Sequence, residues 1–239
     1  MADTLRSLRR LRLAQRGPGG VIRLAAAALV MLSLGASASP VALDLFDDIH
    51  ARLQAAEAKR QTIRARFTQT TTSSLLVKPV VARGTVLGAK PAQLVMTYTS
   101  PERKTIVMDG KRVVIIRPDQ GTSEQIDVTE IVKKVNHYFL NATPGDLRKS
   151  FTVRAFIDPE MLPSSYQMDL LPKRKQIRQG LERLHIWITR EPLLLSQIKM
   201  TFAGGDSDTI KIEDAELNVP IPAHAFDVAF PSPAGQKKK

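Results

Sequence analysis

Apolar residues recur every four positions in residues 43–58. They are Leu45, Ile49 and Leu53, and an α-helix brings positions at this spacing onto one face. Asp44 precedes this stripe and is a residue type that caps helix N-termini. The pattern predicts an amphipathic helix with one face available to cover another element.

Two further stretches have helical character. Residues 129–140 place Tyr138 and Phe139 on an apolar face opposite lysine and asparagine side chains. Thr143–Lys149 opens with a suitable N-cap residue, followed by proline at the first helical position. We therefore expect two or three helices in all.

Elsewhere the apolar pattern has a period of two, which is typical of strands with one buried face. Asp109-Gly110 separates two such segments and is a strong hairpin signal. The alternating segments are residues 63–69, 94–99, 105–108, 112–117, 123–128, 166–170, 184–188, 198–202 and 210–212. A single antiparallel sheet of this size must curl. The chain is therefore predicted to be mainly β, with helices over the concave face.

The N-terminal region has the three parts of a secretory signal peptide. Residues 1–23 contain six arginines and one acid, Leu24–Leu34 is apolar, and Ala36-Ser37-Ala38 is a small-residue cleavage pattern. The apolar run is about half the ~20 residues that a membrane-spanning helix needs. Residues 1–38 are predicted to be removed, so that the mature chain begins at Ser39 in the periplasm.

Charge and cysteine content describe the expected mature protein. Loss of six arginines and one aspartate would reduce the net charge of +12 by 5, to +7. The chain has no cysteine, so we expect neither a disulfide nor an N-terminal lipid anchor. We expect one domain over residues 39–231 and a basic tail over residues 232–239. The sequence shows few aromatics and no nucleic-acid-binding motif, so no nucleic-acid partner is expected.

The residue types needed for common enzyme chemistry do not form a recognisable motif. There is no nucleophile elbow, P-loop, dinucleotide-binding glycine pattern or zinc-ligand spacing. The four histidines fall on separate predicted elements, and His185 occupies an outward, solvated strand position. Asp206-Ser207-Asp208 resembles a calcium loop faintly, but a polar hairpin turn is the favoured interpretation. We expect no enzyme activity, metal or cofactor.

A basic loop contains Lys173-Arg174-Lys175 and Arg178. Such a run is typical of a solvated hairpin end. A role in docking or in binding lipid headgroups is the alternative.

Short segments along residues 43–231 resemble a known family. Taken in order, they are Ala65-Arg66-Phe67-Thr68-Gln69, Gly84-Thr85-Val86-Leu87, Lys90-Pro91 with Tyr98, Pro101 followed by Ile106-Val107-Met108-Asp109-Gly110-Lys111, and Ile210–Asp214 with Asn218, Pro220, Ile221-Pro222, Phe226 and Phe230-Pro231. Their order and spacing resemble those of the outer-membrane lipoprotein carriers (LolA), which are periplasmic chaperones.

The resemblance implies both a fold and a function. The fold would be a curved, incompletely closed antiparallel β-barrel of about 10–11 strands, with a lid of two or three helices over a hydrophobic cavity. The protein would be a monomer that receives acylated lipoproteins from an inner-membrane ABC exporter and delivers them to an outer-membrane receptor. Two alternatives stay open: a carrier of another amphiphile, such as a glycolipid, and a lipoprotein-sensing regulator with the same fold.

The predicted site has two parts, a ligand-binding face and a latch. The ligand-binding residues are expected to be Phe67, Leu94, Met96, Tyr98, Met168, Ile186 and Met200. The alternative is that these side chains simply fill a core. The latch residues are expected to be Lys90, Tyr138 and Phe139.

Lys90 stands where the best-known members of the family have an arginine that contacts the lid and governs ligand release. Lysine keeps the charge but lacks the rigid guanidinium fork. By period two, residue 90 shares the face of Leu94 and Met96. A lone cation there should pair with carbonyls at a helix C-terminus or with an acid on the lid. The alternative is a strand-end lysine that extends into solvent.

Overall fold

A computed structural model describes residues 44–130, 142–157 and 164–227 of the chain. The predicted signal peptide, the latch residues Tyr138 and Phe139 and the basic tail lie outside these ranges. The strands are β1 (Thr62–Thr72), β2 (Val80–Ala89), β3 (Gln93–Ser100), β4 (Lys104–Met108), β5 (Arg112–Arg117), β6 (Thr122–Asp127), β7 (Phe151–Ile157), β8 (Ser165–Pro172), β9 (Arg183–Thr189), β10 (Leu195–Thr201) and β11 (Ser207–Leu217). The helices are α3 (Leu45–Ala58), the 3₁₀ turn η1 (Pro118–Gln120), α5 (Pro144–Ser150) and α6 (Lys175–Arg178).

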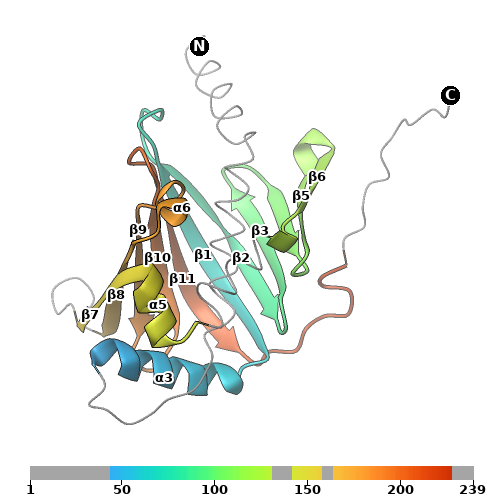
Figure 1. The fold of residues 1–239 in the computed structure, drawn as a ribbon. Helices are drawn as coiled ribbons and strands as arrows, with labels where there is room; N and C mark the ends of the chain where they lie inside the picture. The colour runs from blue at the N-terminus through green and yellow to red at the C-terminus, as the bar shows by residue number, and fades with distance from the viewer. Residues whose placement is uncertain (1–43, 131–141, 158–163, 228–239) are drawn as a thin grey trace.

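All eleven strands form one antiparallel sheet in the order β6-β5-β4-β3-β2-β1-β11-β10-β9-β8-β7. Strand β1 is central and pairs with β2 on one side and with β11, the last strand of the described chain, on the other. The edge strands β6 and β7 do not pair with each other, so the sheet is curved and open (Figure 1). This arrangement confirms the predicted fold class.

The two predicted helices within the described residues form where the sequence places them. Helix α3 is capped by Asp44, whose carboxylate accepts a hydrogen bond from the Asp47 amide at 3.0 Å. Helix α5 is capped by Thr143, with Pro144 at its first position. In Figure 1, α3 runs across one end of the sheet and α5 lies beside β7 and β8.

Strand β2 is not predicted from alternation, because its inward positions are mostly small. Ala82, Gly84 and Gly88 share that face with two larger residues, Val86 and, at the first position of the strand, Val80. Gly84 has a packing reason: a Cβ there would meet the carbonyl oxygen of Thr97 and lie 2.9 Å from the Phe67 ring. The glycine thus lets an aromatic side chain lie over the strand.

Candidate ligand-binding face and lid helix

The seven predicted ligand-binding residues lie on the same face of the sheet. Strand register pairs Phe67 with Gly84, Met168 with Ile186, and Met96 with Ile106 across neighbouring strands. Residues directly opposite each other in an antiparallel pair share a face. All seven are buried in one apolar cluster: Phe67, Leu94, Met96, Tyr98, Met168, Ile186 and Met200. Their binding role stays a prediction.

Helix α3 contributes its apolar stripe to the same cluster. Phe46, Ile49 and Leu53 are buried together with the inner face of the sheet. Figure 1 shows the helix crossing the end of the sheet where the β2–β3 and β9–β10 connections lie. The helix therefore covers one end of the apolar inner face, as a lid would.

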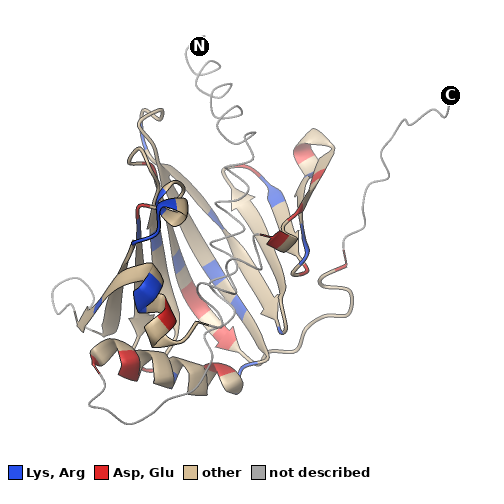
Figure 2. Ribbon diagram, in the orientation of Figure 1, with Lys and Arg blue, Asp and Glu red and all other residues tan. Residues whose placement is uncertain are grey.

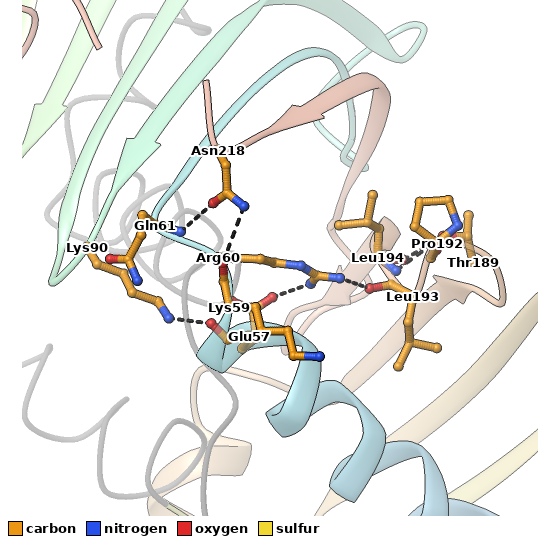
Figure 3. Close-up of polar contacts among 10 residues, drawn as sticks. All are labelled: Glu57, Lys59, Arg60, Gln61, Lys90, Thr189, Pro192, Leu193, Leu194 and Asn218. Atoms are coloured by element: carbon orange, nitrogen blue, oxygen red, sulfur yellow. Dashed lines mark hydrogen bonds and ion pairs between the residues drawn. The ribbon is translucent and has the colours of Figure 1, made fainter. Parts of the chain in front are cut away.

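The Lys90 ammonium donates a hydrogen bond to the main-chain carbonyl of Glu57, in the last turn of α3 (Figure 3). Carbonyls in a last helical turn lack helical partners and carry the negative end of the helix dipole. The expected pairing of this cation with a helix C-terminus is therefore present. Its function as a latch stays a prediction.

Two further side chains hold the same end of α3 (Figure 3). The Arg60 guanidinium pairs with the Glu57 carboxylate and donates to the carbonyl of Leu193 in the β9–β10 connection. Asn218, after β11, accepts a hydrogen bond from the Gln61 amide at 2.8 Å and donates to the Lys59 carbonyl at 3.3 Å. The C-terminal end of the helix is thus joined to the β2–β3 turn, to the β9–β10 connection and to the segment that follows β11.

The N-terminal end of α3 is joined to α5. The Arg148 guanidinium pairs with the carboxylates of Asp44 and Asp47, the latter at 2.6 Å, and lies 5.0 Å from the centre of the Phe46 ring. Burial alone would raise the pKa of Asp44, but the Asp47 amide and Arg148 outweigh it, so the pKa lies below its ordinary value. Asp44 and Asp47 therefore attach the helix to α5 and also interact favourably with the positive end of the helix dipole.

His50 is buried on α3 beside Phe46, with the two ring centres 6.0 Å apart. Its Nδ1 lies 3.1 Å from the amide nitrogen of Gln54. Burial lowers the pKa of His50, an effect that a backbone contact at Ala142 and the charge of Asp47 partly offset. The imidazole on the buried face of the lid helix is thus favoured in its neutral form.

The inner face becomes polar at the end of the sheet away from α3. The Tyr98 hydroxyl donates to the Gln69 side-chain carbonyl at 2.7 Å, and the Gln69 amide reaches the Asp208 carboxylate at 3.4 Å. The Lys104 ammonium lies 4.3 Å from the centre of the Tyr98 ring. Burial raises the pKa of Tyr98 and lowers that of Lys104. Tyr98 therefore ends the apolar face.

The segment Asp206-Ser207-Asp208 lies where the β10–β11 hairpin enters β11. The hairpin turn runs from Phe202 to Asp206, with Gly204 and Gly205 at positive φ, so of the three residues only Asp206 lies in the predicted turn. Ser207 and Asp208 already belong to β11. Among the described residues, no group of three or more potential ligands could hold a metal ion.

His185 corrects one expectation. It does lie on the outer face, but it is only partly exposed, with Nδ1 2.6 Å from the Asp169 carboxylate and its ring stacked beside Trp187. The solvated-face interpretation is wrong because the opposing strand places a carboxylate directly across from it.

The site residues missed from the sequence are Arg60 and Gln69. Arg60 donates to a main-chain carbonyl, and because every residue has one, the sequence does not indicate which residue accepts. Gln69 stands on an inward position of β1, where its polarity among apolar neighbours was the available signal. None of the described helices is long and apolar enough to cross a membrane.

Comparison with known proteins points to one family. Residues 58–229 match the model of the family described as outer membrane lipoprotein carrier protein LolA. The outer-membrane lipoprotein carrier protein of Methylibium petroleiphilum is 26% identical over 179 residues, covering 74% of this chain and 82% of the relative. That of Pseudomonas entomophila is 24% identical over 186 residues, covering 77% and 85%.

A solved structure has a related arrangement at low identity. The lipoprotein LppX of Mycobacterium tuberculosis is 12% identical, covers 73% of this chain and 96% of its own, and superposes with a TM-score of 0.46.

The family match spans well over half of the sequence and includes the sheet, Lys90 and Asn218. The chain therefore belongs to the outer membrane lipoprotein carrier protein LolA family.

Proposed function

We propose that this protein is a periplasmic carrier that binds the acyl chains of lipoproteins and shuttles them from the inner membrane to the outer membrane. Membership of the LolA family and two relatives named as outer-membrane lipoprotein carriers support the carrier function. In this proposal an ABC exporter of the inner membrane supplies the cargo and an outer-membrane receptor accepts it. The protein is exported by a signal peptide over residues 1–38 and acts as a monomer, without catalysis.

The observation that carries the proposal is an apolar inner face beneath a helix that polar contacts hold in place. The face includes Leu94 and Met96, both fully buried, and the lid contributes Ile49. Acyl chains gain about 0.8 kcal/mol for each CH₂ removed from water, so an apolar layer of this kind suits them. Methionines on the face adapt to irregular ligands.

The lid contacts support a reversible opening step. When α3 lifts, the Lys90 ammonium and the Glu57 carbonyl each form hydrogen bonds to water in place of the bond between them, so losing that bond costs only about 1.5–3 kcal/mol. The apolar stripe of α3 leaves the inner face in the same step, and acyl chains take its place. A ligand that binds the open form better shifts the equilibrium toward it.

The test uses methionine as a built-in probe. Photo-reactive methionine incorporated throughout the protein, followed by illumination with a lipoprotein carrying radiolabelled acyl chains, should label peptides containing Met96, Met168 and Met200. Met108 is also on the inner face and buried. The matched control adds unlabelled competitor: an excess of the acylated lipoprotein should abolish the labelling, and an excess of the same lipoprotein with its acylated cysteine changed to serine should not.

Three outcomes decide the proposal. Acyl label on the inner-face methionines supports it. Absence of acyl crosslinks, with the lipoprotein captured equally well in unacylated form, contradicts acyl binding. Recovery of a free glycolipid or other amphiphile, and no lipoprotein, from the native protein would replace the cargo while keeping the carrier.

A further inference from the structure

The sheet end opposite α3 carries an unusual set of exposed side chains. This surface, called here the hairpin end, consists of the β1–β2 hairpin tip (Ser73–Pro79) and the α6 loop (Lys173–Gly180). Strand register places them together: β1 ends at Thr72 opposite Ser207, and β10 ends at Thr201 opposite Arg183, where the α6 loop has just finished. Figure 1 shows both segments at the same end of the sheet.

The hairpin tip exposes large apolar side chains. Leu75 is 74% exposed and Val77 is 98% exposed, and Val81 follows on the same hairpin. Three of the five exposed large apolar residues in the described part of the chain therefore belong to this one hairpin. Single exposed apolar residues are ordinary, but a group at a projecting tip marks an interaction site.

The surroundings of the tip are basic. Lys78 is exposed on the tip itself, and the exposed cations of the α6 loop are Lys173, Arg174, Lys175 and Arg178. Figure 2 shows Lys and Arg over α6 and the segment beside it. The neighbouring acids are Glu182, which is exposed, and Asp206, which is half-buried. Cations thus outnumber acids on this surface.

We propose that the hairpin end is a membrane-contact surface for an anionic lipid bilayer. Leu75 and Val77 enter the interfacial layer, and the basic side chains meet the lipid phosphates. Apolar area combined with nearby cations is the composition that binds peripheral proteins to anionic bilayers. A tip with almost fully exposed side chains suits a deformable phase better than a preformed protein pocket. This contact needs no lipoprotein, so it goes beyond the proposed carrier function.

Vesicle flotation tests the proposal with the ligand-free protein as cells export it. Vesicles of phosphatidylethanolamine and phosphatidylglycerol should bind the protein, and vesicles of phosphatidylcholine alone should bind it more weakly. Leu75→Ser combined with Val77→Ser should reduce binding at least about tenfold. Lys175→Glu combined with Arg178→Glu should remove the preference for anionic vesicles and the dependence of binding on salt.

Two control variants lie at the lid end of the molecule. Ile157→Ser changes an apolar residue that is 42% exposed, and Lys111→Glu changes an exposed cation in the β4–β5 hairpin. Both should bind vesicles like the wild type. All variants share one N-terminal segment, so its contribution cancels in each comparison.

A second measurement uses the absence of cysteine from the chain. Val77→Cys labelled with a polarity-sensitive fluorophore should shift to shorter wavelength and brighten when anionic vesicles are added. The same label on Lys111→Cys should not respond.

Two results would overturn the proposal. One is wild-type vesicle binding by the Leu75/Val77 double variant, with no response from the label at residue 77. The other is no vesicle binding by the wild type, together with loss of lipoprotein transfer in the double variant. That second result would make the hairpin end a docking site for a protein.

Discussion

Helix α3 is attached to the rest of the molecule in different ways at its two ends. At the N-terminal end, Arg148 of α5 pairs with the carboxylates of Asp44 and Asp47. At the C-terminal end, Lys90 and Arg60 donate to main-chain carbonyls of Glu57 and Leu193. Carboxylates lose their charge in acid and are screened by salt, whereas carbonyls keep their acceptor capacity. The C-terminal end has one such carboxylate, Glu57, whose ion pair with Arg60 is more buried than those of Arg148. Acid and salt should therefore loosen the N-terminal end more than the C-terminal end.

Both ends depend on the apolar stripe between them, so its loss should have the largest effect. Ile49 is fully buried between α3 and the sheet. Ile49→Ala should lower the free energy of unfolding by about 2–5 kcal/mol, because it removes apolar contacts and leaves a cavity. Chemical denaturation measures this. Leu75→Ala, at an exposed position, is the control and should stay within about 0.5 kcal/mol of the wild type. An equal effect of both variants would mean that α3 is not packed on the sheet.

The next effect concerns the C-terminal attachment. Lys90→Leu leaves the Glu57 carbonyl without its donor and should cost about 1–2 kcal/mol of stability, equally at low and high salt. If the proposed carrier function is correct, the rate of lipoprotein release from the inner membrane and the rate of delivery to the receptor should change by different factors. The two steps are measured separately in a transfer assay.

Lys90→Arg is the matched variant, because it keeps the cation and its donors. It should restore both stability and the balance between uptake and delivery. Wild-type rates for both transfer steps in Lys90→Leu would show that this residue is not a latch.

The two ends of α3 also differ in how far the sequence predicts them. The helix, its Asp44 cap and the inward face of Leu94 and Met96 follow from periodicity, which depends only on local geometry. The Lys90 contact could be predicted because its spacing from Leu94 and Met96 placed it on an apolar face that offers few acceptors, although the structure has it in the turn just after β2.

The remaining contacts depend on chain geometry far from each residue. Arg60 reaches the Leu193 carbonyl across 133 positions, and any residue supplies a carbonyl. His185 looked solvated because alternation gives its face but not its neighbour, Asp169. The polar network of Gln69 and Asp208 needs the register of β1 with β11, which no local pattern supplies.

A smaller effect is expected at the N-terminal attachment. Arg148 is about one-third exposed, so its ion pairs with Asp44 and Asp47 are partly screened by solvent. Arg148→Ala should lower stability by about 0.5–1 kcal/mol in dilute buffer. In about 1 M NaCl, where the Debye length is near 3 Å, the difference should shrink. A loss that does not change with salt would assign the effect to packing of the guanidinium on Phe46 instead.

The smallest effect at neutral pH, and one that grows in acid, belongs to His50. Burial lowers its pKa in the folded protein below the value near 6.5 of the unfolded chain. As the pH falls through about 6.5, the unfolded chain binds a proton before the folded one does, so protonation favours unfolding. Stability from the buried neutral imidazole is thus complete above that pH and is lost below it.

The pH dependence of unfolding separates this effect from the carboxylates. The pKa of Asp44 is lowered from 3.8, so its contribution is lost only at more acidic pH. His50→Leu should flatten the stability profile just below about pH 6.5 while leaving the steeper loss in stronger acid, where the carboxylates bind protons. Gln54→Ala removes the same His50–Gln54 hydrogen bond but keeps the titrating ring, so its profile should keep the wild-type slope. If His50→Leu retains that slope instead, the imidazole on the buried face of α3 is not the group that couples the lid to acid.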